Sequence, residues 1–412
     1  MTSVTDFNPL APETVECPYP FYKAMREEAP VYQVPGAGFF IVSRHEDIKQ
    51  VSADLASFSS NSGPGVDSRG GAVSDPEMHE ITSKGFPDVN TLLTADPPDH
   101  ARYRGLVNKA FSARRVAIME PSVRQIASDL FDTFKSKGRA ELIHEFAAPL
   151  PLTVIADALG VPRSDLWTFK KWSDDSVAPL SGFMTRERQL ECAQSIVDFQ
   201  HYFAAKLEER RANPQDDLLT DLINSRLDGE QPLNTAEMLS ILQQILVAGN
   251  ETTTNLIASG TMLLCQHPEQ VASLQADRSL IPNLVEEALR MESPVQGLFR
   301  MAKVDTEVGG VKIPAGSRLV LMYASANRDE CVYADSESFD ISRENARTHL
   351  AFGHGIHFCL GAALARLEAN IAFEMLLRLK NLRMTPGQND LTHVPSFILR
   401  GLNQLNVEFD PA

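Results

Sequence analysis

The sequence predicts a mainly α-helical protein with a small β portion, folded as a single domain over residues 1–412. Apolar residues recur at spacings of three and four along most of the long segments of the chain, which is the periodicity of an amphipathic helix. Strand-like stretches are few and short. No internal repeat or low-complexity linker divides the chain, so we expect one folded unit.

The helical periodicity is clearest in five long segments. In each of them the apolar positions form one stripe on the helix surface, which is the pattern of a helix packed against a core. These predicted helices cover residues 116–136, 186–212, 235–265, 281–291 and 360–380.

The β portion is expected in two regions. "GFFIVS" (38–43) reads as a strand near the N-terminus. The stretch "VDTEVGGVKIPAGSRLVLMYASANRD" (304–329) reads as further strands, with a hairpin turn at Gly309-Gly310 and a second turn at 314–316. Residues 59–95 are rich in Gly, Ser, Pro and Asp and have no clear period. Loops of this length often cover an active site.

Composition excludes several classes of protein. The formal net charge of −16 argues against nucleic acid or an anionic membrane as a partner. The N-terminus has no apolar signal segment, and no run of about 18 apolar residues predicts a membrane anchor. An odd number of widely spaced cysteines fits reduced thiols and a cytoplasmic protein. They are Cys17, Cys192, Cys265, Cys331 and Cys359.

The stretch "HLAFGHGIHFCLGAAL" (349–364) allows three interpretations. His354, His357 and Cys359 could bind zinc, but a structural zinc site needs four ligands and no CxxC or HxxxH pattern supplies the rest. The cysteine could be a small buried hydrophobic residue. It could also be the thiolate ligand of an iron.

The residues around Cys359 favour the iron thiolate. Gly353, Gly355 and Gly361 would let the backbone approach a flat ligand closely. An amphipathic helix follows the cysteine, and the N–H groups at a helix N-terminus stabilise a thiolate. A thiolate ligand pushes electron density onto a haem iron and favours O–O cleavage.

The pattern Phe352-x-x-Gly355-x-x-x-Cys359-x-Gly361 resembles the haem-binding loop of the cytochrome P450 superfamily. The resemblance extends over nearly the whole chain. It implies the P450 fold, haem b as the cofactor, Cys359 as the axial iron ligand and residues 349–361 as the haem-thiolate loop. It also places His357 where the family has a propionate-binding Arg or His.

"EEALR" holds Glu287-x-x-Arg290 on a predicted helix, at a spacing that lets the two side chains pair. An isolated pair of this kind is usually a surface ion pair. The resemblance instead implies the buried Glu–Arg pair of the family, with Arg343 as its third member. Its role would be structural, to hold the cysteine loop.

"VAGNETTT" (247–254) lies within a long predicted helix. Gly249 costs about 1 kcal/mol there relative to Ala, and Thr252 could simply bond back to a carbonyl at a hydrated kink. The resemblance implies that Ala248 and Gly249 lie against the haem, and that Glu251 and Thr252 are the catalytic acid–alcohol pair. Reduction of dioxygen consumes protons, which a carboxylate can relay and a hydroxyl can direct.

Three further basic residues, together with His357, match the positions where the family binds the haem propionates. His100 and Arg104 are four residues apart after a plausible helix start at Pro97-Pro98-Asp99, and Arg300 follows "SPVQGLF". Each alone would read as a solvated surface cation. Arginine suits this role because its planar fork binds a carboxylate through two hydrogen bonds.

By the same resemblance, the substrate pocket includes parts of 59–95 and of 171–184. Most of its expected residues are apolar, which predicts an apolar small-molecule substrate. Gln244 could hydrogen-bond a polar group of the substrate, or could face solvent or a neighbouring backbone. Terpenoid, steroid, fatty acyl and aromatic substrates remain open. The expected pocket residues are Gln244, Val247, Ala248, Val295, Leu298, Phe397 and Ile398.

We therefore expect a monomeric haem-thiolate monooxygenase that uses O2 and electrons from NAD(P)H, delivered by a ferredoxin reductase and a ferredoxin. The alternatives are a peroxygenase that uses H2O2, and a non-catalytic haem carrier or sensor. Retention of Glu251 and Thr252 favours the monooxygenase, because known peroxygenase members replace this pair and a sensor needs no proton supply.

The segment "HARYRGLVNKAFSARRV" (100–116) is the predicted ferredoxin-docking patch. It carries four basic residues in addition to the propionate ligand Arg104, and it has no acidic residue, so it could attract an acidic partner to a protein of net negative charge. The four could also be ordinary solvated surface cations. They are Arg102, Lys109, Arg114 and Arg115.

Overall fold

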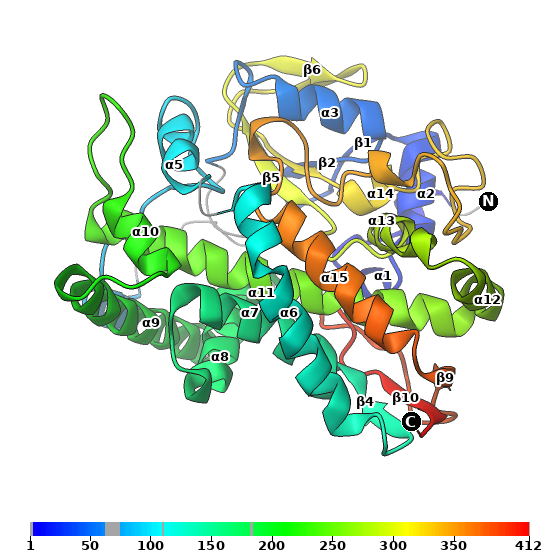
Figure 1. Ribbon diagram of the computed structural model, residues 1–412. Helices are drawn as coiled ribbons and strands as arrows, with labels where there is room; N and C mark the ends of the chain where they lie inside the picture. Colours follow the sequence, from blue (N-terminus) through cyan, green and yellow to red (C-terminus); the bar gives the residue numbers. More distant parts are fainter. Residues whose placement is uncertain (1–2, 62–74, 109–110, 182–183, 412) are drawn as a thin grey trace.

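The computed structural model describes residues 3–61, 75–108, 111–181 and 184–411, and it confirms a mainly helical fold with a small β portion (Figure 1). The helix α11 runs through the middle of the molecule, and α6 and α15 cross it on the side facing the viewer. The largest sheet lies to one side of these helices with α2 and α3, and α8, α9 and α10 lie on the other.

The long helices agree closely with the predicted segments. The periodic segment 116–136 overlaps α6, which ends two residues earlier, at Phe134. It also begins three residues earlier, at Ala113, because Ser112 caps its N-terminus by accepting a hydrogen bond from the Arg115 N–H. The described helices are α1 (Pro12–Glu16), α2 (Tyr19–Glu28), α3 (His45–Ala53), α4 (Pro76–Thr82), α5 (Asp99–Val107), α6 (Ala113–Phe134), α7 (Pro149–Leu159), α8 (Leu166–Val177), α9 (Arg186–Ala212), α10 (Leu218–Asn224), α11 (Thr235–Gln266), α12 (Pro268–Ala276), α13 (Ile281–Met291), α14 (Tyr323–Ala326) and α15 (Ala362–Leu376).

The strands form three small sheets. A five-stranded sheet has the order β1-β2-β8-β5-β3, in which only β2 and β8 are parallel. The second sheet has the order β4-β10-β9, and β6 and β7 form a hairpin. The strands are β1 (Val31–Gln33), β2 (Phe39–Val42), β3 (Phe58–Ser59), β4 (Arg139–Glu141), β5 (Leu298–Ala302), β6 (Thr306–Val308), β7 (Val311–Ile313), β8 (Arg318–Leu321), β9 (Lys380–Met384) and β10 (Asn406–Asp410).

Two predictions about the irregular regions need correction. The hairpin turns at Gly309-Gly310 as expected, but the strand prediction over 304–329 extends too far, because the chain leaves β8 at Leu321 and forms α14. Residues 59–95 are also not a continuous loop. They contain α4, which Asp75 caps by accepting hydrogen bonds from two N–H groups. Residues 62–74 of this segment lie outside the described part of the chain.

The helix α11 joins two hydrophobic cores. Its first half packs with α7, α8 and α9, and its second half packs with α6, α13 and α15. The capping box of Asn234 and Glu237 fixes its start, since each side chain accepts a hydrogen bond from the other residue's backbone N–H. Between the two cores, residues 247–252 belong to neither cluster, and Ala248 is exposed.

None of the helices within the described ranges combines the length and the apolar character needed to span a membrane.

Candidate functional site

The loop 349–361 connects a short 3-10 turn to α15 and presents Cys359 just before the helix begins. The Cys359 N–H donates to the carbonyl of Phe352 at 2.9 Å, which closes the loop on itself. Gly353 and Gly355 have φ values of 71° and 72°. A Cβ on Gly355 would lie 2.9 Å from the carbonyl oxygen of Ser52. The loop therefore requires these glycines for its own backbone conformation, whether or not a flat ligand also lies close to them.

Burial and the neighbouring groups act in opposite directions on the pKa of the Cys359 thiol. Burial raises its pKa, although the N–H groups of Gly361 and Ala362 and the charges of Arg104 and Arg366 act in the opposite direction. The helix N-terminus thus contributes as predicted but is outweighed by desolvation. A metal cation bound at Sγ would deprotonate the thiol outright.

The zinc interpretation of this loop finds no support in the described part of the chain. No group of three or more His, Cys, Asp and Glu side chains gathers there as a metal site. His354, His357 and Cys359 therefore do not converge on a common point, and the cysteine is the one candidate metal ligand of the loop.

The sequence pattern Glu287-x-x-Arg290 forms a fully buried ion pair. The guanidinium of Arg290 donates to both carboxylate oxygens of Glu287, at 2.7 and 2.8 Å, and Arg343 donates to the same carboxylate at 3.1 Å. The side chains of Glu287 and Arg290 are 0% exposed. The two arginines also bind backbone carbonyls of the segment leading to the cysteine loop, at Asn327, Ala334, Asp335, Ser336 and Ser338.

A second buried network, which sequence reasoning missed, joins the same helix to the cysteine loop. Glu286 accepts from Arg366 at 2.6 and 2.9 Å, and its carboxylate lies 3.0 Å from the ring of His349. Burial acts to raise the pKa of Glu286, but His349 and Arg366 outweigh it and lower the pKa to about 2. In the sequence, the one sign of this second network was the additional glutamate, Glu286, in "EEALR".

Glu251 and Thr252 lie in the middle of α11, in the stretch 247–252 that belongs to neither hydrophobic core. The Thr252 hydroxyl donates to the carbonyl of Ala248 at 2.7 Å, the back-bonding that the residues alone suggested. Glu251 is held by Lys170 of α8, with Nζ 3.4 Å from Oε2. Lys170 also pairs with Asp174. Burial acts to lower the pKa of Lys170, but the two carboxylates outweigh it and raise the pKa.

The four predicted propionate partners lie close to one another, and few carboxylates lie near them. The rings of His100 and His357 are 4.3 Å apart. The Nε2 atom of His100 is buried with no hydrogen-bond partner in the described chain. Arg300 is buried and donates to the carbonyl of Phe299, but it has no carboxylate partner in the described ranges. Arg104 donates to Asn108 at 3.0 Å, and burial lowers the pKa of its guanidinium.

Both ring nitrogens of His357 have protein partners. Nε2 lies 2.8 Å from the Ser60 hydroxyl, and Nδ1 lies 3.2 Å from the carbonyl of Leu92. Burial lowers the pKa of His357 to about 3, helped by the positive charges of Arg300 and His100. The ring is therefore neutral at physiological pH.

These observations fit haem b. A soft sulfur donor at Cys359 faces a region where a Cβ on Gly361 would meet no protein atom within 4 Å. Ala248 is exposed although it lies mid-way along a helix whose two halves are buried. His100 and Arg300 are buried polar groups that have no carboxylate partner among the described residues, and propionates would supply the missing acceptors.

The predicted substrate-pocket residues divide into two groups. Val247 and Ala248 reach open space in the middle of α11, and Val295 and Leu298 are partly exposed at the edge of the sheet core. Phe397 and Ile398 are buried in that core, where the Phe397 ring packs 5.9 Å from the ring of Phe39. Phe397 and Ile398 are therefore buried side chains, and their contact with substrate stays a prediction.

Gln244 follows the second of its two predicted alternatives, a contact with protein backbone. Its Oε1 accepts from the Leu93 N–H at 2.9 Å, and its Nε2 donates to the Thr91 hydroxyl at 2.9 Å. Both ends of the amide are therefore occupied by the protein. Of the segment 171–184 predicted at the pocket, residues 182–183 lie outside the described ranges.

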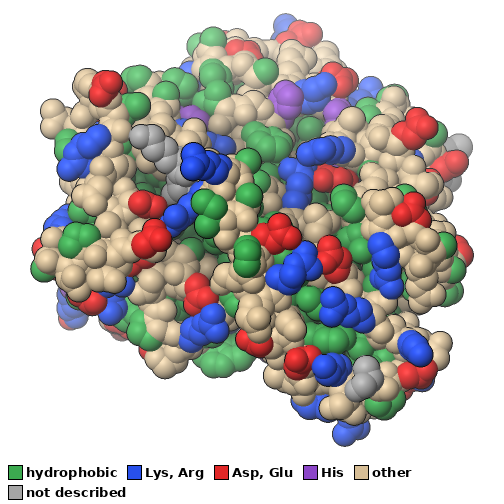
Figure 2. Space-filling view, viewed as in Figure 1, with side chains coloured by type: hydrophobic (Ala, Val, Ile, Leu, Met, Phe, Trp, Pro, Cys, Tyr) green, Lys and Arg blue, Asp and Glu red, His purple; other side chains and the backbone are tan. Residues whose placement is uncertain are grey.

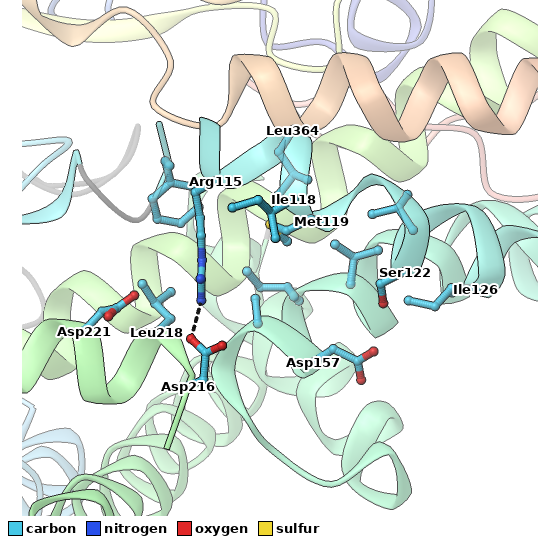
Figure 3. Close-up of a pocket in the computed structure, with 15 residues that line it drawn as sticks. Arg115, Ile118, Met119, Ser122, Ile126, Asp157, Asp216, Leu218, Asp221 and Leu364 are labelled. Carbon is cyan, nitrogen blue, oxygen red and sulfur yellow. Dashed lines mark hydrogen bonds and ion pairs between the residues drawn. The ribbon is translucent and has the colours of Figure 1, made fainter. Parts of the chain in front are cut away.

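The predicted docking patch is broken up by ion pairs. Arg102 is only 14% exposed and pairs with Glu237 at 2.7 Å, and Arg115 pairs with Asp216 at 3.0 Å (Figure 3). Figure 3 shows Arg115 at the side of a cavity of about 220 Å³. Arg114 is exposed with no ion pair in the described chain, and Lys109 lies outside the described residues. The sequence could not reveal Glu237 and Asp216 as partners, because they are more than 100 residues away.

A different basic surface surrounds the cysteine. A second cavity is lined by Cys359, by the exposed ring of Phe358, and by the guanidinium groups of Arg104, Arg347 and Arg366. Figure 2 shows basic side chains on this face of the molecule, with acidic side chains among them. Arg347 is exposed and has no acidic partner in the described part of the chain.

Known proteins of one family resemble this chain over almost its whole length. The cytochrome P450 family model matches residues 170–406. "Cytochrome P450 107B1" of Saccharopolyspora erythraea is 40% identical over 397 residues, which cover 94% of this chain and 93% of that protein. The "6-deoxyerythronolide B hydroxylase" of the same organism is 35% identical, over 95% of this chain and 96% of that protein.

The fold agrees as well. The solved structure of cytochrome P450 CYP109Q5 from Chondromyces apiculatus superposes with a TM-score of 0.86 and is 40% identical. The superposition covers 99% of each chain.

Proposed function

We propose that this chain hydroxylates an apolar small molecule, with electrons from NAD(P)H delivered through a ferredoxin. The chain belongs to the cytochrome P450 family and is a haem monooxygenase. The observation that carries the proposal is the stretch of α11 around the exposed Ala248, residues 247–252, which we call the opening. Glu251 and Thr252 lie there, between two buried halves of the helix. Haem b, when bound, supplies the activation of dioxygen.

The residues that would hold haem b come from four parts of the chain. Cys359 would bind the iron through Sγ. His100, Arg104 and Arg300 would face the propionates, as charge or hydrogen-bond partners. His357 would lie beside them, with its ring nitrogens held by Ser60 and Leu92. Gly361 and Ala248 leave the space that a flat ring requires.

Glu251 and Thr252 would move protons to the reacting oxygen. The carboxylate of Glu251 is 15% exposed and is joined through Lys170 to Asp174, so a path of polar groups leads from the site toward the surface of α8. The Thr252 hydroxyl lies on the next position of the helix and can donate a hydrogen bond into the opening once it turns from the Ala248 carbonyl. This proton supply favours a monooxygenase over a peroxygenase or a haem sensor.

The surface of the opening supports an apolar substrate. Val247 and Ala248 are its described contacts on α11, and the Gln244 amide is fully used by the protein. An apolar lining with few polar groups binds apolar ligands. A relative that is named a hydroxylase, 6-deoxyerythronolide B hydroxylase, supports the same reaction type.

Turnover assays under two conditions, with the NAD(P)H–ferredoxin system or with H2O2 alone, test this function. We expect product when the haem-loaded protein, a ferredoxin, its reductase and NAD(P)H are combined with an apolar compound that shifts the ferric Soret band. Equal or faster product formation with H2O2 alone would favour the peroxygenase. Reversible ligand binding without product under either condition would favour the carrier or sensor.

The surface around Cys359 would dock the ferredoxin. Ferredoxins are acidic, and this protein has a net charge of −16, so attraction must come from a local basic area. Arg347 lines this cavity, and Arg114 follows its lining residue Ser112 by two positions; both are exposed and have no ion pair in the described chain. Phe358 adds an exposed apolar contact. Attraction between such exposed charges weakens as salt rises.

Charge reversal tests the docking surface. Arg347→Glu and Arg114→Glu should each raise the ferredoxin concentration needed for half-maximal electron transfer, and should reduce its dependence on salt. Arg139→Glu, an exposed change in β4, is the matched control. The assignment of this docking surface is wrong if both charge reversals leave the ferredoxin dependence as the control variant does.

A further inference from the structure

A short segment links the central helix to the cysteine loop. We call residues 91–93 the strap. Gln244 of α11 holds it from one side, because its amide oxygen accepts from the Leu93 N–H and its amide nitrogen donates to the Thr91 hydroxyl, both at 2.9 Å. Thr91 is completely buried. One side chain thus fixes both ends of the strap.

The middle residue of the strap contacts the cysteine loop. The carbonyl of Leu92 lies 3.2 Å from Nδ1 of His357. A carbonyl can only accept a hydrogen bond, so Nδ1 carries the proton. On the other side of the ring, Nε2 lies 2.8 Å from the Ser60 hydroxyl. The position of the Leu92 carbonyl therefore helps to fix the orientation of the His357 ring.

The other side of His357 is held through Ser60. Asp96 accepts hydrogen bonds from the Ser59 hydroxyl at 2.5 Å and from the Ser60 N–H at 2.8 Å. The ring of His100 also packs 4.3 Å from the ring of His357. Of these contacts, the one at Nδ1 is made by the residue that lies between the two held by Gln244.

We propose that Gln244 is a positioning residue for the haem site. It holds the strap so that the Leu92 carbonyl locks His357 in the loop that carries Cys359. The inference rests on the proposed role of His357 beside the haem. It builds on the predicted alternative in which Gln244 bonds backbone, and it links the position of α11 to that of the cysteine loop.

The rate of haem release from the ferric protein to apomyoglobin measures this effect, together with the haem reduction potential. Gln244→Leu removes both bonds to the strap and should speed haem release on the order of five- to tenfold, the effect of about one net hydrogen bond. Gln244→Glu should restore the wild-type rate, because its carboxylate can accept from both the Leu93 N–H and the Thr91 hydroxyl.

The adjacent glutamine supplies a matched control. Gln243 donates from its amide nitrogen to the Ser176 hydroxyl of α8 at 3.2 Å and does not touch the strap. Gln243→Leu therefore removes the same chemical group from the same helix, and should leave the haem-release rate and the reduction potential unchanged. If it changes both as much as Gln244→Leu does, the effect belongs to α11 in general and the proposal is wrong.

A double-mutant cycle shows whether the effect passes through His357. In a His357→Phe background, Gln244→Leu should have no further effect on haem release, because the contact that the strap controls is already absent. Additive effects would overturn the proposal. Should Gln244→Leu fold poorly, Thr91→Val removes one of the two bonds and should give a smaller change in the same direction.

These outcomes are separate from the proposed function. A wild-type protein that binds haem through Cys359 but forms no product would contradict the function, and the cycle could still be measured on it. A productive enzyme in which Gln244→Leu leaves haem release unchanged would contradict the role of Gln244 alone.

Discussion

Lys170 of α8 and Glu251 of α11 form an ion pair across the two helices, with Nζ 3.4 Å from Oε2. Their side chains are 21% and 15% exposed, so the pair is shielded from much of the solvent. The carboxylate that the proposed function requires for proton delivery is therefore held by a cation from a helix 81 residues earlier in the chain.

Removal of this pair should slow the reaction. Glu251→Gln keeps the size of the side chain but cannot relay a proton, and should reduce product formation by roughly 10²-fold, the lower range for a lost acid–base group. Lys170→Gln should give a smaller loss, because Glu251 stays in place without its partner. Product formation under saturating ferredoxin measures both effects.

The neighbouring lysine is the control for that experiment. Lys171 pairs with Asp175 rather than with Glu251, and its side chain is 62% exposed. Lys171→Gln should leave product formation close to wild type. Equal losses in the two lysine variants would mean that the Lys170–Glu251 pair has no special part in the reaction.

Thr252→Ala should separate electron consumption from product formation. The variant loses the hydroxyl that directs protons in the opening of α11, while the helix itself keeps its backbone hydrogen bonds. NAD(P)H consumption should continue, and hydrogen peroxide should appear in place of much of the product. An unchanged ratio of product to NAD(P)H consumed, measured with the best substrate, would contradict the role of Thr252.

The buried pair of Glu287 and Arg290 should be essential for folding. Glu287→Ala leaves two arginines buried without their carboxylate, which costs roughly 3–5 kcal/mol of unfolding free energy, and should give little haem-loaded protein. Glu46→Ala removes an exposed pair with the same spacing, Glu46 with Lys49, and should cost no more than about 1 kcal/mol. Urea unfolding with the haem content of each preparation measures the difference. Equal stability of the two variants would rule out a structural role for the pair.

Glu368 of α15 should make the stability depend on pH. Its side chain is buried, its Oε2 has no hydrogen-bond partner in the described chain, and burial raises its pKa well above the ordinary value. The neutral acid is therefore the folded form. Its contribution to stability is fully present below the unfolded pKa of about 4.3, and is lost as pH rises through the folded pKa.

Thermal unfolding at several pH values tests this effect. Glu368→Gln is neutral at every pH, so its melting temperature should exceed that of the wild type by an amount that grows from pH 5 to pH 9. Glu344→Gln, at an exposed position, should show no such trend. A constant difference between Glu368→Gln and wild type across this range would show that Glu368 titrates normally.

The sequence predicted the long helices well because local periodicity determines them. The segments 186–212 and 281–291 agree with α9 and α13 to the residue. The cysteine loop and the Glu287–Arg290 pair were found because their residues lie close together in the chain. The end of β8 at Leu321 was missed, because tertiary packing, and not local pattern, turns the chain into α14.

The errors in the site share a physical cause. The partners of Gln244, Arg102 and Glu251 lie 151, 135 and 81 residues away. A polar side chain in a sequence looks free until its distant partner is known. Sequence reasoning therefore left the role of Gln244 open between substrate and backbone and placed Arg102 on the docking patch, whereas both side chains bind groups of the protein.

The most direct test of the account is the Soret band of the reduced carbon monoxide complex. With Cys359 as the iron ligand, the wild-type protein should show the red-shifted band of a thiolate-ligated haem. Cys359→His should bind haem but lose that band, because an imidazole replaces the thiolate. A Cys359→His variant that keeps the red-shifted band would contradict the assignment of Cys359, and with it the site proposed for this protein.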